Sequence, residues 1–257
     1  MRRRQMRKRK INVVFLVSLA VFLVAAVQFV RIGKGYLDGR KEYKELQNLA
    51  VHEPEKKKGE KPKIQVDFDK LLKVNGDTVG WLHFEPEPKI IDYPVVQGKD
   101  NEEYLHKTFS AKENTLGAIF LSVENQKDFS DRHSVIYGHR MRDGSMFRHL
   151  QDYDRKAFWK KNQRFYLYTL DGRELTYRIY MAGEILDTSK TYRTEFADDK
   201  EFEEFLKQTK EEAFYDTGLL PDVDSQIVTL STCTGASDHH RIVVRGYKEK
   251  ELLVTGE

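Results

Sequence analysis

Residues 11–30, INVVFLVSLAVFLVAAVQFV, form a run of 20 residues without a charge, and this run limits the fold more than any other feature of the chain. Only Asn12, Ser18 and Gln28 within it are clearly polar. About 20 apolar residues in a helix cross the hydrocarbon core of a bilayer. The run therefore predicts a single transmembrane anchor over 11–31, followed by the folded part of the chain.

The charges around this run predict its orientation. The first ten residues carry seven of the 44 Lys and Arg residues and no acidic residue. Because basic flanks stay in the cytoplasm, we expect 1–10 to be a cytoplasmic tail and the chain after residue 31 to lie outside the cell. A cleaved signal peptide is the alternative, since Ala25 and Ala26 are small, but the apolar run is longer than a usual signal core.

The net charge of +3 comes from that tail. The rest of the chain has 37 basic residues (44 minus 7) against 41 acidic residues, a net charge of −4. A nucleic-acid partner requires a basic patch on the folded domain itself, so we expect no nucleic acid among the partners. The membrane is expected as a partner of the N-terminal helix. Aromatic residues make up 12% of the chain, which favours a folded core over disorder.

Residues 32–63 connect the anchor to the folded part. Within them, 33–50 predicts a juxtamembrane helix, and 52–63 predicts an exposed linker because it combines two prolines with dense charges. From 64 to 257 we expect one extracellular domain, mostly β with helical insertions. The expected strands lie within 77–84, 90–98, 116–122, 133–139, 164–170, 174–186, 226–232 and 241–248, and the expected helices within 67–74, 100–109, 146–162 and 198–213. About eight strands without βαβ alternation favour a mostly antiparallel sheet or barrel.

Cys233 is the only cysteine of the chain. A single thiol outside the membrane makes no internal bridge, so it is a buried inert residue, an intermolecular disulfide or a reactive nucleophile. In TLSTCTGASDHHR one β-type run ends at Cys233 and the next opens at Arg241. If these runs pair as a hairpin, the two side chains face each other. The guanidinium would then donate hydrogen bonds to the oxygen of a carbonyl attacked by the thiolate, although an exposed, unpaired arginine at a strand edge is the alternative.

Such a nucleophile also needs a proton donor for the leaving amine. Of eight histidines, His139 stands out because it follows the β-type run SVIY and Gly138, where we expect a sharp turn that puts the ring at the strand end. His239 and His240 are explained by loop polarity. A metal site built from them and Cys233 is disfavoured, since adjacent histidines project in different directions. No metal and no organic cofactor is expected.

These motifs together resemble the signature of the sortases, membrane-anchored cysteine transpeptidases of Gram-positive bacteria. The motifs are TLSTC, the arginine of RIVVRG eight residues after the cysteine, and YGH at 137–139. The helical segment ahead of the β-rich part, the stretch YPVVQGKDNEEYL and the helix at 198–213 are similar to class B sortases. The resemblance implies an eight-stranded sortase-like β-barrel with N-terminal helices and one transmembrane helix.

The resemblance also implies roles for individual residues. Cys233 would be the nucleophile, His139 the general acid and base, and Arg241 the oxyanion or substrate clamp. The family reaction cuts a C-terminal sorting signal of secreted surface proteins after its threonine, forms a thioester and passes the protein to an amine of a peptidoglycan precursor. The positions that match the peptide groove of class B relatives are Asn101, Leu105, Tyr192, Ser231 and Thr232. For Leu105, core packing is the alternative.

Other functions stay open at this point. A hydrolytic cysteine peptidase would use the same residues with water in place of the amine. Cysteine L,D-transpeptidases place histidine and glycine directly before the cysteine, whereas LST precedes Cys233 here. A non-enzymatic anchored module that binds a wall component, with a buried cysteine, is the third alternative.

Overall fold

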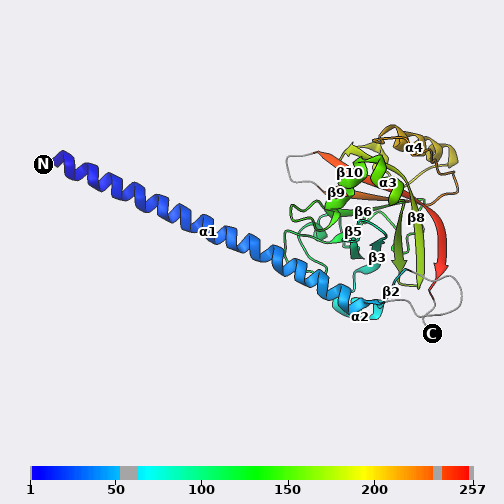
Figure 1. Cartoon of the computed structure of the whole chain (residues 1–257), viewed down its shortest axis with the longest axis horizontal. Coiled ribbons are helices and arrows are strands. Elements are labelled where there is room, and N and C mark those ends of the chain that lie inside the picture. The colour runs from blue at the N-terminus through cyan, green and yellow to red at the C-terminus, as the bar shows by residue number, and fades with distance from the viewer. Residues whose placement is uncertain (1, 53–62, 234–238, 255–257) are drawn as a thin grey trace.

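The computed structural model describes residues 2–52, 63–233 and 239–254, with the backbone alone at 2–14 and 233. A long helix, α1 (Arg2–Ala50), leads into a β-barrel (Figure 1). One continuous helix thus covers the expected anchor and the juxtamembrane helix. Within it, Phe15–Ala50 is long and apolar enough to cross a membrane, and the large apolar side chains of 15–30 are exposed.

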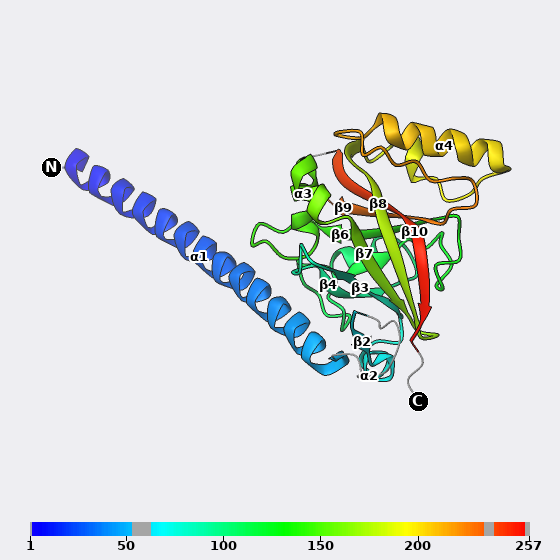
Figure 2. The ribbon, with the colours of Figure 1, turned by 45° about the vertical axis from the view of Figure 1, so that its right-hand side comes forward.

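The last turns of α1 lie beside the barrel (Figure 2). The buried positions there repeat every three or four residues, the spacing of one helix face: Gly39, Tyr43, Leu46 and Ala50. The helix is followed by β1 (Val51–His52), which pairs with β2 (Gln65–Val66). Residues 53–62 of the expected linker lie outside the described residues.

Eight strands close into a barrel in the order β10-β8-β7-β3-β4-β5-β6-β9, which confirms the expected fold class. Their bounds are β3 (Thr78–Phe84), β4 (Asp92–Val96), β5 (Ile119–Leu121), β6 (His133–His139), β7 (Arg164–Thr169), β8 (Arg173–Leu186), β9 (Ile227–Cys233) and β10 (His240–Leu253). Neighbouring strands are antiparallel except for β4–β5 and β6–β9, which are parallel. The parallel β6–β9 pair brings the carboxyl ends of two strands that are distant in the sequence to the same edge.

The alternation of side chains separates two layers of core at this part of the barrel. Ile136 of β6 and Leu230 of β9 belong to the main core, whereas Ile227 of β9, one face over, belongs to a second cluster. Phe202 and Phe205 of α4 (Asp199–Glu211) complete this second cluster. Helix α4 therefore covers the outer face of β9 and β10, and Figure 2 shows it on this side of the barrel.

The shorter helices follow their capping signals. Helix α2 (Phe68–Val74) begins after Asp67, whose carboxylate accepts from the amide of Lys70 at 3.1 Å. Helix α4 begins after Asp198, which accepts from the amide of Glu201 at 2.8 Å. The expected helical segment 146–162 forms two pieces, η2 (Phe147–Asp154) and α3 (Lys156–Lys161). The β7–β8 hairpin turns at Asp171 and Gly172, as expected, with Gly172 at φ +81°.

The expected helix over 100–109 is wrong. Only a single 3₁₀ turn, η1 (Glu103–Leu105), forms there, although Asp100 accepts from the amide of Glu103 at 2.8 Å as a capping residue would. After this turn the chain doubles back, and the amide of Asn114 donates to the carbonyl of His106 at 2.8 Å. The backbone groups of this segment are satisfied by the returning chain instead of by a helix.

Candidate active site

Cys233, His139 and Arg241 occupy one row across three neighbouring strands. In the parallel β6–β9 pair, His139 and Cys233 are register partners, and strands of a sheet lie about 4.8 Å apart. In the antiparallel β9–β10 pair, Val243 is the partner of Ser231. Arg241 precedes Val243 by two residues and Cys233 follows Ser231 by two residues, so both lie at the same end of this strand pair. The backbone thus brings the three expected catalytic positions together at one end of the sheet.

The imidazole of His139 is half-buried and is held by the last residue of η1. Its Nε2 lies 2.6 Å from the carbonyl oxygen of Leu105. Because a carbonyl oxygen only accepts, Nε2 carries a hydrogen, and Nδ1 is the nitrogen left to exchange a proton. Burial lowers the pKa of His139, the hydrogen bond to Leu105 opposes this shift, and the charge of the nearby His106 adds to it. The neutral form of the ring is therefore favoured.

Gly138 serves packing and does not make the expected sharp turn. It lies within β6 and pairs with Thr232. A Cβ at this position would lie 2.4 Å from the Cδ1 of Ile119 and 2.8 Å from the ring of Phe147. The strand therefore runs straight to His139, and the glycine is needed because two side chains cross over it.

The guanidinium of Arg241 is held by a carboxylate that sequence reasoning missed. Its Nη2 lies 3.2 Å from Oδ2 of Asp187, which follows β8, and its Nη1 donates to the carbonyl of His240 at 3.2 Å. His239 bonds the same carboxylate at 3.1 Å. The hydrogen bond from His239 and the charge of Arg241 lower the pKa of Asp187. Only the β8–β10 register, in which Arg241 pairs with Ile185, reveals this contact.

Among the described residues, no three His, Cys, Asp or Glu side chains are grouped to hold a metal ion. His239 and His240 bond two separate carboxylates, those of Asp187 and Glu184. The two adjacent histidines therefore face different partners.

Tyr192 contacts Ser231, which lies two residues before Cys233 on β9. Tyr192, in η3 (Lys190–Tyr192), places its hydroxyl 2.7 Å from Oγ of Ser231. Its ring also stacks on Tyr137 of β6, with the ring centroids 6.2 Å apart. Tyr137 is the register partner of Ser231, and sequence reasoning had singled it out only as part of the YGH motif. Tyr192 of η3 and Tyr137 of β6 thus form an aromatic wall beside the row of catalytic positions.

The other expected groove residues have different surroundings. The side chain of Thr232 is buried, and its hydroxyl accepts from the amide of Ile242 at 3.0 Å. Asn101 bonds the chain after β5, donating to Glu124 at 2.9 Å and accepting from the amide of Val123 at 2.9 Å. Leu105 packs partly against the core, as the core-packing alternative describes, while its carbonyl oxygen bonds the ring of His139.

A buried polar network lies beneath η3. Arg245 of β10 is fully buried, and its Nη1 lies 3.0 Å from Oε2 of Glu212. It also donates to the hydroxyls of Thr191 at 2.7 Å and Thr229 at 3.1 Å. The Thr229 hydroxyl in turn bonds Nε2 of His133 at 2.7 Å. This network ties η3 and the chain after α4 to the outer face of the barrel.

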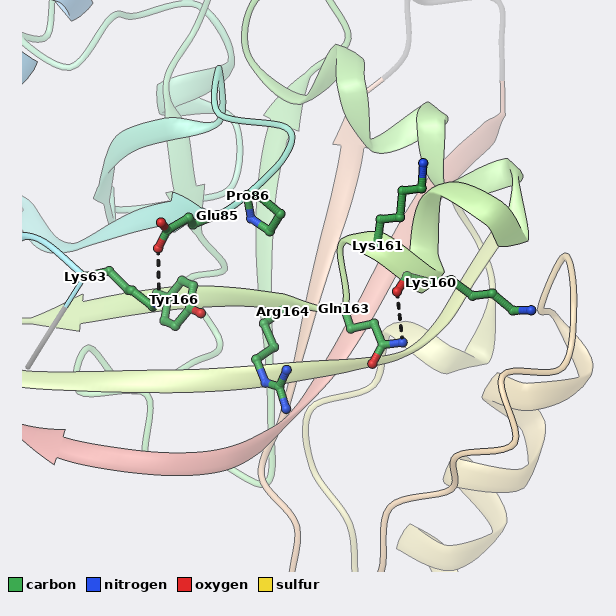
Figure 3. Close-up of a pocket in the computed structure, with 8 residues that line it drawn as sticks. All are labelled: Lys63, Glu85, Pro86, Lys160, Lys161, Gln163, Arg164 and Tyr166. Carbon is green, nitrogen blue, oxygen red and sulfur yellow. Dashed lines mark hydrogen bonds and ion pairs between the residues drawn. The ribbon is translucent and has the colours of Figure 1, made fainter. Parts of the chain in front are cut away.

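A cavity of about 350 Å³ lies elsewhere on the barrel, between the residues that follow β3 and the start of β7 (Figure 3). It is lined by Lys63, Glu85, Pro86, Lys160, Lys161, Gln163, Arg164 and Tyr166. Two of its cations are already paired, because Lys63 lies 3.2 Å from Glu85 and Arg164 bonds Glu249 at 2.6 Å. The cavity contains no residue of the His139 row and no nucleophilic thiol, so it is separate from the candidate site.

A comparison with known families assigns this barrel to a class of enzyme. The family model described as the Sortase domain matches residues 86–249. The sortase B of Listeria monocytogenes is 33% identical over 187 residues, which cover 71% of this chain and 74% of that protein. The chain belongs to the sortase family, whose members are cysteine transpeptidases.

Within this family the chain is similar to class B sortases. The sortase B of Staphylococcus aureus is 27% identical over 241 residues, which cover 92% of this chain and 96% of that protein. The structure of the sortase B of Bacillus anthracis matches with a TM-score of 0.73 and 30% identity, covering 84% of this chain and 99% of that one. A substrate complex of the Staphylococcus aureus sortase B matches with a TM-score of 0.66 and 30% identity, covering 73% and 85%.

Proposed function

We propose that this sortase cleaves a C-terminal sorting signal of secreted surface proteins and transfers the protein to an amine of the cell wall. The single observation that carries the proposal is that His139 and Cys233 are register partners, with Arg241 at the same end of the neighbouring strand β10. A solved sortase B is a complex with substrate, and another is a complex with triglycine, which supports a peptide and an amine as the two partners.

The first half of the reaction forms a thioester. The Cys233 thiolate attacks the carbonyl carbon of the threonine of the signal, and the carbonyl oxygen takes up the negative charge. The guanidinium of Arg241 donates hydrogen bonds to that oxygen. The imidazolium of His139 gives its proton to the leaving nitrogen, the C–N bond breaks, and the acyl group stays on sulfur.

The second half releases the product. The neutral imidazole of His139 takes a proton from the incoming amine as its nitrogen attacks the thioester carbonyl. A new C–N bond forms, the C–S bond breaks, and Cys233 leaves as the thiolate. Because Nε2 is bonded to the carbonyl of Leu105, Nδ1 is the nitrogen that exchanges the proton in both halves. A low pKa of the ring suits the second half, which begins with the neutral imidazole.

The N-terminal part of α1 would anchor this enzyme in the membrane. Residues 11–31 would span the bilayer, 1–10 would stay in the cytoplasm, and the barrel would lie outside the cell. The support is the apolar stretch within Phe15–Ala50 together with the basic residues ahead of it. This arrangement places the barrel on the side where secreted proteins and cell-wall precursors are found.

The peptide would lie along the aromatic wall beside the row. Tyr192 and Ser231 are joined at 2.7 Å and stand next to the catalytic positions, so they are the best supported groove residues. Leu105 would contribute through its carbonyl, which orients His139. Asn101 would act from the loop that it binds after β5, and Thr232 would act by holding β9 against β10.

Mass spectrometry of the acyl-enzyme tests the proposal. The full-length chain in detergent micelles is mixed with a panel of Asn-Pro, Leu-Pro and Ser/Pro-Pro signal peptides, and one of them should add the mass of its acyl fragment to the chain. Cys233→Ala should abolish this adduct with the fold intact by circular dichroism. His139→Ala should slow adduct formation on the order of 10³-fold or more. An adduct that persists in Cys233→Ala would refute the assignment.

The same experiment separates the two other candidate functions. With an amine such as triglycine present, a transpeptidase gives the peptide–amine product, whereas a hydrolytic peptidase gives only the free acid. A non-enzymatic module gives no adduct with any peptide, and a buried cysteine in such a module resists alkylation in the native state. Since the chain has one cysteine, alkylation reports on Cys233 alone.

A further inference from the structure

The segment 105–117 is held between the last turns of α1 and the ring of His139. On one side, Nε2 of His139 lies 2.6 Å from the carbonyl oxygen of Leu105. A Cβ built on Gly117 would lie 2.6 Å from Cδ2 of the same ring, so the backbone at Gly117 lies directly against the imidazole. This segment therefore forms the surface on which His139 rests.

On the other side, helix α1 holds the same segment at its two ends. The Tyr43 hydroxyl is buried and donates to the carbonyl oxygen of Gly117 at 2.7 Å. The carboxylate of Glu42 accepts from the hydroxyl of Thr108 and from the amide of Ser110, both at 2.9 Å. The first contact lies on the residue that supports the ring, and the second lies on the turn that follows Leu105.

Close packing adds to these hydrogen bonds. A Cβ on Gly39 of α1 would lie 2.9 Å from Cδ2 of Leu116, so the helix approaches the segment as closely as a glycine allows. Asn114 donates to the carbonyl of Gly35 at 2.9 Å. The helix and the segment are thus joined along 105–117 by contacts that are buried or partly buried.

We propose that Tyr43 and Glu42 are positioning residues for catalysis: through Gly117 and the 105–110 turn, the last turns of α1 fix the orientation of the His139 imidazole. The proposal rests on the proposed role of His139 as acid and base. It gives the N-terminal helix a second task besides anchoring, because the helix that would enter the membrane also completes the support of a catalytic side chain.

Loosening this support has two expected consequences. The ring would sample orientations in which Nδ1 points away from the thiol, and a small misplacement of a catalytic group is expensive in rate. Water would also reach the ring, so its pKa should rise toward the ordinary value near 6.5, because burial is the main cause that lowers it. His106 is the charged group that acts on the ring among the described residues, and it is unaltered in the variants below.

The test compares Tyr43→Phe and Glu42→Gln with Glu45→Gln in the full-length chain in detergent micelles. Glu45 is a matched control, because it lies one turn further along α1, is largely exposed and pairs only with Lys41 at 3.7 Å among the described residues. Two readouts are used: the rate of thioester formation with a signal peptide, and the NMR titration of the His139 ring, assigned by its loss in His139→Gln. Circular dichroism verifies that each variant is folded.

Tyr43→Phe and Glu42→Gln should each slow thioester formation on the order of tenfold and raise the pKa of the His139 ring, with peptide affinity unchanged. Glu45→Gln should match the wild type in both readouts. An unchanged His139 titration in both variants overturns the inference, whether or not the rate falls. If the wild type itself forms no thioester with any peptide, the proposed function fails, and the NMR titration alone decides whether α1 orients the ring.

Discussion

His139 and Cys233, 94 residues apart in the chain, are register partners at the ends of the parallel strands β6 and β9. This relationship depends on a parallel pairing inside a mostly antiparallel barrel. A hairpin would have set the end of one strand beside the start of the next. The parallel pair instead puts the carboxyl ends of the two strands side by side, with His139 and Cys233 as partners.

Replacement of Arg241 should separate the effect of its charge from that of its shape. Arg241→Ala should lower kcat/KM for signal-peptide cleavage on the order of 10³-fold, because the oxygen loses its hydrogen-bond donors. Arg241→Lys should recover only part of this loss, since an ammonium lacks the planar fork. Asp187→Asn keeps an acceptor for the guanidinium at 3.2 Å and should cost less than either. Normal cleavage by Arg241→Ala would show that the assigned role is wrong.

The stability of the protein should fall in mild acid because of His133. This ring is fully buried, and burial lowers its pKa to about 3 from 6.5, with the charge of Arg245 adding to the shift. Above pH 6.5 neither state is protonated at this residue, and below it only the unfolded state binds the proton. The free energy of unfolding should therefore drop by roughly 1.4 kcal/mol per pH unit between pH 6.5 and 3.

Urea unfolding at pH 7.5, 6.0 and 5.0 measures this effect. Relative to His133→Gln, the wild type should lose about 2 kcal/mol between pH 7.5 and pH 5.0. Equal pH dependence in the wild type and His133→Gln would show that His133 is not the group that titrates.

The buried Arg245 should be worth far more to stability than an exposed arginine with a similar ion pair. Arg245→Met leaves Glu212 and two threonine hydroxyls without their donor and should cost about 3 kcal/mol of unfolding free energy. Arg164→Met breaks an exposed pair with Glu249 and should cost less than about 1 kcal/mol. Urea unfolding of the two variants makes the comparison, and equal losses would contradict it.

The contact between Tyr192 and Ser231 should appear as a coupling energy. A double-mutant cycle of Tyr192→Phe and Ser231→Ala should give about 1 kcal/mol in the free energy of unfolding, the usual net value of one hydrogen bond. Pairing Tyr192→Phe with Ser225→Ala, whose hydroxyl bonds Asp222 at 2.8 Å, should give no coupling. Additive effects in both cycles would mean that the hydroxyl contact is not maintained in solution.

Local signals in the sequence were sufficient to predict most helices and strands of this protein. These signals depend on interactions within a few residues, so the elements that they form can be predicted from the sequence. They are the apolar run, the alternating runs of β-branched and aromatic residues, the caps Asp67 and Asp198, and the Asp171-Gly172 turn. The segment 100–109 also carried a local helix signal, with Asp100 as a cap. It does not form a helix, because contacts with distant parts of the chain, including α1, stabilise another path.

Tertiary structure alone decided how the candidate site is assembled. The sequence named Cys233, His139 and Arg241, but whether β6 pairs with β9 depends on the order of strands around the closed barrel, which no local pattern encodes. The same holds for the partners of these residues. Asp187 contacts Arg241 because of the β8–β10 register. The carbonyl of Leu105 bonds the ring of His139 because the end of η1 packs against the end of β6. Spacing along a chain predicts which residues carry chemistry, whereas close packing between distant segments determines what each of them touches.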